Sequence, residues 1–237
     1  MVRPKRLHHP GFIFHVINRG NNRQAIFLED EDYERYLGIL YRYKIKFNFH
    51  IFAYCLMTNH VHLLIQVNEN ASISKIMQCI TIAHTRHYHF KYRSGGHVWQ
   101  GRFRSPLVSN DEYLLKVMLY IEQNPVRAKM VKRVQDYHWS SYKLQIMKKS
   151  PKMIDRDQNP AYVRLGGAED ERRNSYQRLM QKELEEFDQK QIEKSLKGEG
   201  HYISERFREQ INEMLPRKRS IGRPRKSLVV NLLEETL

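Results

Sequence analysis

The sequence predicts an α+β fold, in which helices cover one face of an antiparallel sheet and a helical extension follows at the C-terminal end. Two periodicities and their order support this prediction. Alternation of apolar and polar residues with period two indicates strands, and apolar residues three or four positions apart indicate amphipathic helices. They succeed one another as strand, helix, strand, strand, helix, strand. This is the order of the ferredoxin-like split βαβ fold.

The composition indicates a folded protein that binds a polyanion. The chain has 237 residues, of which 41% are hydrophobic, and its formal net charge of +15 favours nucleic acid as the partner. No apolar run approaches the roughly 18 residues of a membrane span. The two cysteines, Cys55 and Cys79, lack CxxC spacing and suit reduced core thiols. We therefore expect a cytoplasmic protein without a membrane partner.

The first strand is predicted at residues 12–17, after the turn signal Pro10-Gly11. The basic loop Arg19-Gly20-Asn21-Asn22-Arg23 follows it, and such a loop suits either a close approach to phosphates or an ordinary solvated turn. Acidic residues at 29–32 favour the start of a helix there through the helix dipole. A second strand is predicted at residues 49–56.

The third strand follows the turn signal Asn59 and carries the first chemical signal. Its odd-numbered residues, 61–67, are apolar and would face the helices. His60 and His62 would point to the opposite, open face, ~7 Å apart along the backbone. Neutral imidazole is the commonest metal ligand, so the two rings could converge on one ion. The alternative is a strand with two polar residues on a half-solvated face.

A second long helix is predicted at residues 72–92, followed by residues 98–105 with strand character. The latter segment interleaves aromatic and cationic side chains. Trp99 with Arg102 and Arg104 is typical of single-strand binders, in which bases stack on rings and phosphates pair with cations. Equally, Trp99 could be a core residue.

The next helix begins with the capping-box spacing of Ser109 and Glu112 and ends before Pro125. Tyr120 and Asn124 lie one turn apart on a side that differs from its apolar side, with Asn124 at the helix end. The alternative is a surface tyrosine on an amphipathic helix that ends in asparagine.

The C-terminal part is predicted to be an appendage. The expected divisions are a main domain at 1–145, a polar linker at 146–168, a helical region at 169–216 that starts with one long helix to about residue 196, and a basic tail at 217–237. In the tail, Gly222-Arg223-Pro224 is similar to the core of an AT-hook, which lies in the minor groove. The other interpretation is a disordered basic tail with sequence-independent affinity for phosphates.

Six stretches within residues 1–145 match one family in order and spacing. They are Arg3-Pro4, Phe14-His15-Val16 with Arg19-Gly20-Asn21, Met57-Thr58-Asn59-His60-Val61-His62-Leu63-Leu64, Val98-Trp99-Gln100-Gly101-Arg102-Phe103, Tyr120-Ile121-Glu122-Gln123-Asn124-Pro125-Val126-Arg127-Ala128 and Asp136-Tyr137-His138-Trp139-Ser140-Ser141. Together they resemble the single-tyrosine HUH transposases, especially the REP-associated tyrosine transposases, which carry an IS200-like transposase domain and share the ferredoxin-like sheet.

The resemblance implies roles for individual residues. His60 and His62 would be metal ligands, Asn124 would complete the metal shell, and Tyr120 would be the nucleophile. Glu122 stands where the family usually has a histidine. The expected nucleic-acid contacts lie in the matching stretches and in the tail, and are Arg3, Arg19, Asn21, Arg23, Trp99, Arg102, Arg104, Arg127, Arg223 and Arg225.

The implied activity is that of a transposase, a metal-dependent endonuclease and strand transferase that acts on single-stranded DNA beside hairpins. Tyr120 would form a 5′-phosphotyrosine intermediate, with Mg²⁺ or Mn²⁺ polarising the phosphate. The expected setting is the bacterial cytoplasm, near the nucleoid, and the expected state is a homodimer or a monomer. The alternative is a catalytically inactive protein that binds hairpin DNA or RNA. The presence of all four site residues favours the enzyme.

Overall fold

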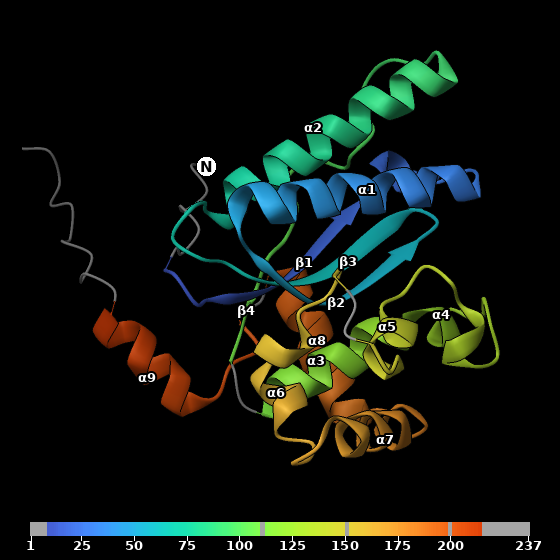
Figure 1. The fold of residues 1–237 in the computed structure, drawn as a ribbon. Coiled ribbons are helices and arrows are strands. Elements are labelled where there is room, and N and C mark those ends of the chain that lie inside the picture. The colour runs from blue at the N-terminus through green and yellow to red at the C-terminus, as the bar shows by residue number, and fades with distance from the viewer. Residues whose placement is uncertain (1–8, 110–111, 150–151, 199–200, 215–237) are drawn as a thin grey trace, which may run out of the picture. The chain divides into compact units, whose positions relative to one another are not determined.

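A computed structural model describes residues 9–109, 112–149, 152–198 and 201–214, and its four strands form one antiparallel sheet. The strands are β1 (Ile13–Arg19), β2 (His50–Met57), β3 (His60–Gln66) and β4 (Leu107–Val108). Their order is β2-β3-β1-β4, with β3 paired to both β1 and β2 (Figure 1). This order and the antiparallel pairing confirm the predicted ferredoxin-like α+β fold.

Helices and short 3₁₀ segments make up most of the remaining described chain. They are η1 (Asn21–Arg23), α1 (Asp30–Phe47), α2 (Ile73–Tyr92), α3 (Glu112–Glu122), α4 (Asn124–Arg127), η2 (Val134–Asp136), α5 (Tyr142–Ile146), η3 (Arg156–Gln158), α6 (Pro160–Val163), α7 (Glu169–Met180), α8 (Glu186–Lys197) and α9 (Glu205–Met214). Among the described residues, no helix is both long enough and apolar enough to cross a bilayer.

Helices α1 and α2 lie side by side across one face of the sheet (Figure 1). Local sequence sets where they begin. Glu29 and Asp32 form a capping box at the start of α1, and the Ser72 hydroxyl accepts a hydrogen bond from the Lys75 amide at the start of α2. The odd-numbered residues 61–65 of β3 are fully buried and face these helices, as predicted.

The prediction of an open second face is wrong. Helix α3 packs against β2 and β3 on that face, and α6 and α8 pack against α3 (Figure 1). Ile13 and Leu64 of the sheet join Val117 and Ile121 of α3 in one buried cluster. The sheet is therefore covered on both sides, because the C-terminal helices fold back on it instead of forming an appendage.

Residues 98–105, predicted as the fourth strand, are not a strand. They form one isolated bridge with β1, between Arg104 and Ile17, and β4 begins at Leu107. Gly101 has a φ of 78°, which turns the backbone out of extended geometry. The Trp99 side chain anchors the segment on α2, where its Nε1 donates to Thr85 Oγ1 over 3.1 Å.

The predicted linker at 146–168 is also wrong, since much of its described part belongs to the core. Arg156 is only 1% exposed, and its Nη1 donates to three carbonyl groups at the end of α5. Its other nitrogen, Nη2, pairs with Glu169 of α7 over 2.9 Å. Asp155 pairs with Lys44 of α1 over 2.9 Å. These polar residues, which suggest a solvated linker in the sequence, form hydrogen bonds and ion pairs with the rest of the fold.

The chain as far as Ser204 is one compact unit, so residue 145 is not a domain boundary. The single helix predicted up to about residue 196 is two helices, α7 and α8, and α9 belongs to a second unit that starts at Glu205. The predicted basic tail at 217–237 lies outside the described residues.

A buried carboxylate fastens α3 to the elements around it. Glu122, at the end of α3, is fully buried and accepts hydrogen bonds from Ser141 Oγ, Gln145 Nε2 and Tyr176 Oη. The Ser141 hydroxyl in turn accepts a hydrogen bond from the Tyr54 amide of β2. Burial raises the pKa of Glu122 to about 7, although these three donors act to lower it. One side chain thus ties α3 to α5, α7 and β2.

We expect Glu122→Gln to flatten the pH dependence of stability. Because the pKa of Glu122 is raised in the folded protein, this group favours folding below pH 4.5 and loses that contribution as the pH rises to about 7. The wild-type free energy of unfolding should therefore fall by up to about 3 kcal/mol through this window. Urea unfolding at several pH values measures it. Glu34→Gln, at an exposed position, is the control, and equal pH dependence in the two variants would contradict the prediction.

Candidate active site

His60 and His62 point to the same face of β3, as predicted, and their ring centroids are 5.0 Å apart. His62 is 2% exposed and His60 is half-buried. In the pairing with β1, His60 lies opposite Arg19 and His62 lies opposite Ile17. The two rings therefore lie at the end of the sheet where β1 leads into its basic loop.

Asn59 determines the tautomer of His60. Asn59 Nδ2 donates to the Arg23 carbonyl over 3.1 Å, and Asn59 Oδ1 lies 2.6 Å from His60 Nδ1. Because Oδ1 can only accept, His60 Nδ1 carries the proton. Nε2 of His60 then keeps a free lone pair, which is the form of imidazole that binds a metal ion.

A third histidine, to which the sequence assigns no role, completes the cluster. His15 of β1 is buried, and its Nε2 lies 2.9 Å from Nδ1 of His62, so one ring donates to the other. Within the described chain, Nδ1 of His15 has no hydrogen-bond partner. In the sequence, His15 stands out only as a polar residue in an otherwise apolar run. Its contact with His62 depends on the register of β1 against β3, which the sequence does not show.

All three imidazoles are neutral at pH 7. Burial lowers the pKa of His15 to about 3, that of His60 to about 4, and that of His62 well below its ordinary range. The positive charge of Arg19 adds to the effect at His60. No group of three or more His, Cys, Asp or Glu side chains among the described residues could hold a metal ion. A cation here would need a further ligand of another kind.

The structure brings Tyr120 to these histidines. Its ring centroid lies 6.0 Å from that of His62 and 5.9 Å from that of His15. The meeting follows from α3, which packs on the face that the histidines of β3 share. Tyr120 is only 6% exposed, so it does not lie on a solvated side of α3. Burial raises the pKa of its phenol, and Arg127 acts in the opposite direction.

Arg127 covers the ring of Tyr120. Its Cζ lies 4.0 Å from the ring centroid, and its Nη2 donates to the Tyr120 carbonyl over 2.6 Å. Nη1 of Arg127 is buried and has no hydrogen-bond partner within the described residues. A guanidinium nitrogen in this state is suited to donate hydrogen bonds to an anion, for example to a phosphate oxygen. Arg127 therefore lies inside the candidate site.

Asn124 begins α4, one turn after Tyr120. Its Nδ2 donates to the Tyr120 carbonyl over 3.0 Å. Its Oδ1, which makes no hydrogen bond to another described residue, is the only side-chain atom of Asn124 that could bind a cation.

Helix α8 borders the site, which the sequence does not predict because it places α8 in an appendage. The negative charge of Glu193 on α8 acts to raise the pKa of both Tyr120 and Arg127. At the end of α8, the Leu196 carbonyl accepts a hydrogen bond of 2.7 Å from Arg104 Nη1. Arg104, predicted to contact DNA, thus already stabilises the last turn of this helix.

The predicted binding loop from Arg19 to Arg23 lies beside the segment that contains Trp99 and Arg102. The Asn21 amide donates to the Val98 carbonyl over 2.9 Å, and Gly20 forms a bridge with Trp99. Arg23 and Arg102 are exposed, and Arg19 and Asn21 are half-buried. Two stretches that are far apart in sequence therefore form one edge of the site.

The interpretation of Trp99 as a stacking platform is wrong, because Trp99 is 9% exposed and packs on α2. Three other predicted contacts, Arg3, Arg223 and Arg225, lie outside the described residues.

Residues 9–124 match the family model described as Transposase IS200 like. Over 108 residues the chain is 32% identical to a Haemophilus influenzae protein named a REP-associated tyrosine transposase. That match covers 40% of this chain and spans 59% of the length of the relative.

The fold is similar to that of a solved REP-associated tyrosine transposase bound to a REP hairpin. The TM-score is 0.53 at 20% sequence identity, and the alignment covers 65% of this chain and 92% of the other. The likeness supports the arrangement of the sheet and its helices.

Replacing Arg19 with glutamine should raise the pKa of His60. The positive charge of Arg19, on the residue opposite, disfavours the imidazolium form. Burial persists in the variant, so the pKa should lie between about 4 and 6.5. Nitrogen-detected NMR of the histidine rings in EDTA-treated protein measures it. Arg102→Gln is the matched control, and a His60 pKa that is unchanged in Arg19→Gln would mean that burial alone sets it.

Proposed function

We propose that this protein cleaves and rejoins DNA strands with Tyr120 as its nucleophile, because residues 9–124 match the family model described as Transposase IS200 like. The observation that supports this best is the packing of the Tyr120 ring against two neutral imidazoles, those of His15 and His62. A positioned nucleophile beside groups that can hold a charge-neutralising cation is what attack on a phosphodiester requires.

The proposed cofactor is a divalent cation, Mg²⁺ or Mn²⁺, held by His60 Nε2, His62 Nε2 and Asn124 Oδ1. The donors suit such an ion: the rings are neutral, and two nitrogens with one amide oxygen favour Mn²⁺ over Mg²⁺. For His62 Nε2 to be free, His62 must donate its Nδ1 proton to His15 Nε2. The bound cation would polarise the scissile phosphate and stabilise the departing 3′ oxygen.

In the proposed reaction, Tyr120 Oη attacks the phosphorus of the phosphodiester. The bond between phosphorus and the 3′ oxygen breaks, and the phenol proton ends on that oxygen, which leaves as a free 3′ hydroxyl. The product is a 5′-phosphotyrosine. Attack by a 3′ hydroxyl on this linkage reverses the step, so rejoining needs no ATP because the phosphoester is conserved.

On substrate binding, the guanidinium of Arg127 would leave the ring of Tyr120 and bind the phosphate instead. The phenol is nearly covered, and the nearest cover is the guanidinium stacked on it. Since Nη1 of Arg127 lacks a partner among the described residues, a phosphate oxygen would draw the guanidinium off the ring and expose the phenol. Arg19 would supply a second positive charge beside the phosphate.

The proposed substrate is single-stranded DNA next to a hairpin. Attack by a recessed tyrosine needs an accessible phosphate, which an unpaired strand offers. The solved relative holds a REP hairpin, and exposed Arg23 and Arg102 on this chain would bind the DNA backbone.

Tyr120→Phe should abolish covalent attachment to DNA. We expect wild-type protein, incubated with Mn²⁺ and a labelled hairpin oligonucleotide with a single-stranded flank, to form an adduct that survives denaturing electrophoresis. EDTA should prevent it. Tyr113→Phe, one heptad earlier on α3, is the matched control and should keep the adduct. An adduct in Tyr120→Phe would remove the assignment, and tight hairpin binding without any wild-type adduct would indicate a binding protein.

His15→Leu should weaken Mn²⁺ binding by roughly 10- to 100-fold, because it removes the partner that orients His62. Electron paramagnetic resonance of free Mn²⁺ measures this without any assay of activity. His97→Leu, at an exposed position, is the control and should leave the affinity unchanged. Equal Mn²⁺ affinity in the two variants would exclude the positioning role of His15.

A further inference from the structure

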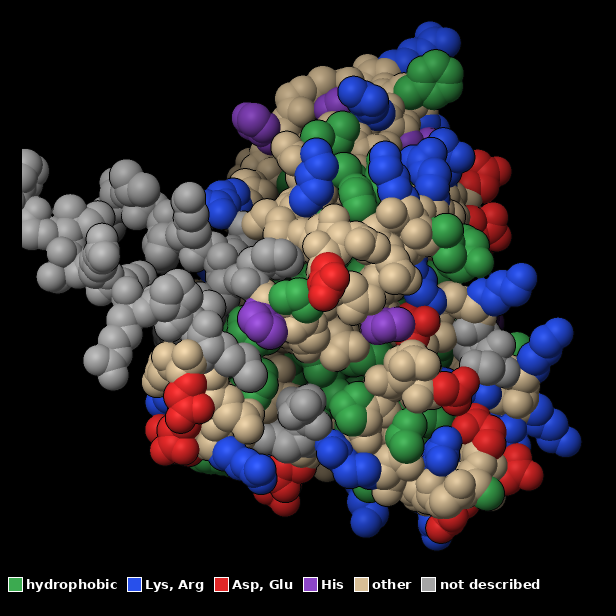
Figure 2. All heavy atoms as spheres, turned by 60° about the vertical axis from the view of Figure 1, so that its left-hand side comes forward, with side chains coloured by type: hydrophobic (Ala, Val, Ile, Leu, Met, Phe, Trp, Pro, Cys, Tyr) green, Lys and Arg blue, Asp and Glu red, His purple; other side chains and the backbone are tan. Residues whose placement is uncertain are grey.

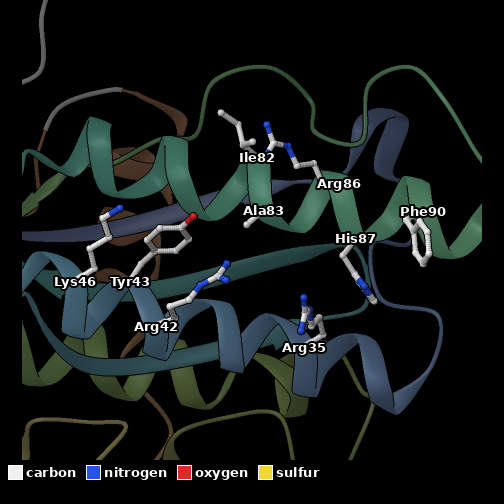
Figure 3. A pocket seen from close by; sticks show the side chains of 9 residues that line it. All are labelled: Arg35, Arg42, Tyr43, Lys46, Ile82, Ala83, Arg86, His87 and Phe90. Carbon is white, nitrogen blue, oxygen red and sulfur yellow. The ribbon is translucent and has the colours of Figure 1, made fainter.

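A groove between α1 and α2 lies on the face of the sheet opposite the candidate active site (Figure 1). This interhelix groove has a volume of about 670 Å³, and Arg35, Arg42, Lys46 and Arg86 are among the residues that line it. Figure 3 shows the three cations of α1 reaching toward α2, and His87 reaching back from α2. The proposed strand cleavage uses none of these residues.

No acidic side chain of the described residues pairs with the cations of the interhelix groove. Helix α2 contains no acidic residue, and α1 contains none after Glu34. None of the four cations of the groove forms an ion pair within the described chain. Glu29, Glu31 and Asp32 instead pair with Lys91, at 3.1–3.2 Å. Unpaired cations that share one groove favour a polyanion as its ligand.

Apolar groups stand among these cations. Phe90 of α2 is 88% exposed, and it lines the groove together with Tyr43 of α1 and Ile82 of α2. Figure 2 shows several Lys and Arg side chains with hydrophobic ones between them in its upper part, the level at which α1 and α2 lie. Aromatic rings beside cations are what single-stranded nucleic acids bind, since bases stack on the rings while phosphates pair with the cations.

We propose that the interhelix groove binds a second, single-stranded segment of nucleic acid. From Arg35 to Lys46 the cations extend ~16 Å along α1, which is room for several phosphates of an extended strand. A duplex would offer phosphates but keep its base faces stacked, so Phe90 and Tyr43 would gain no partner. The site is on the other face of the sheet from Tyr120 and does not depend on the chemistry proposed there.

The test measures binding of fluorescein-labelled, unstructured oligonucleotides to the full-length protein by anisotropy, with oligodeoxyuridine and oligouridine as separate arms. Arg42→Glu with Lys46→Glu should bind both about 10-fold or more weakly, and the slope of log K against log salt should become shallower by about 1.4. Phe90→Ala should lose about 5-fold or more in affinity at an unchanged slope, because it removes stacking but no charge. The stronger of the two arms identifies the sugar.

Lys148→Glu with Lys149→Glu is the matched control, since it changes the net charge equally at exposed positions after α5. This control should bind within about 2-fold of wild type. The groove variant should still form the Tyr120 adduct with a short hairpin, which separates this site from the catalytic one. The neutral pair Arg42→Gln with Lys46→Gln should weaken binding in the same direction. Equal losses in groove and control variants, or duplex binding as tight as single-strand binding, would overturn the proposal.

Discussion

The antiparallel pairing of β1 with β3 is the constraint on which the candidate site depends. In this register Arg19 lies opposite His60, Ile17 lies opposite His62, and His15 comes within hydrogen-bond distance of His62. Because side chains alternate with period two, a slip of one residue would turn the imidazoles toward α1 and α2. Such a slip would also turn the apolar residues of β3 to the other face. Burial of both faces therefore specifies the register, and the register assembles the histidines.

The tyrosine comes from α3, so α3 has to be held as firmly as the sheet. Glu122 does this from inside the core, through hydrogen bonds that reach α5 and α7. Helix α8 adds a negative charge, Glu193, near both Tyr120 and Arg127. The chain after residue 145 is therefore part of the scaffold that positions the phenol. A domain cut at that residue would lose α6 and α8, which pack against α3.

Elements that follow from a local sequence pattern could be predicted. Contacts between polar residues that are far apart in the sequence could not. The three long strands, α1 and α2 follow from periodicity and capping, and the family resemblance identified the tyrosine that meets the histidines. Arg156 resembles a solvated linker residue, because nothing nearby in sequence shows that the end of α5 and Glu169 will surround it. Trp99 suits stacking and burial equally until α2 is placed beside it. His15 acquires its partner only through a strand 47 residues away.

Asn59 joins two parts of the protein through one amide. Its nitrogen holds the Arg23 carbonyl in the basic loop, and its oxygen orients His60. A change at this one residue would therefore alter the loop and the orientation of the imidazole together. Arg102, which is exposed and lies outside this shared contact, could change without disturbing the imidazole.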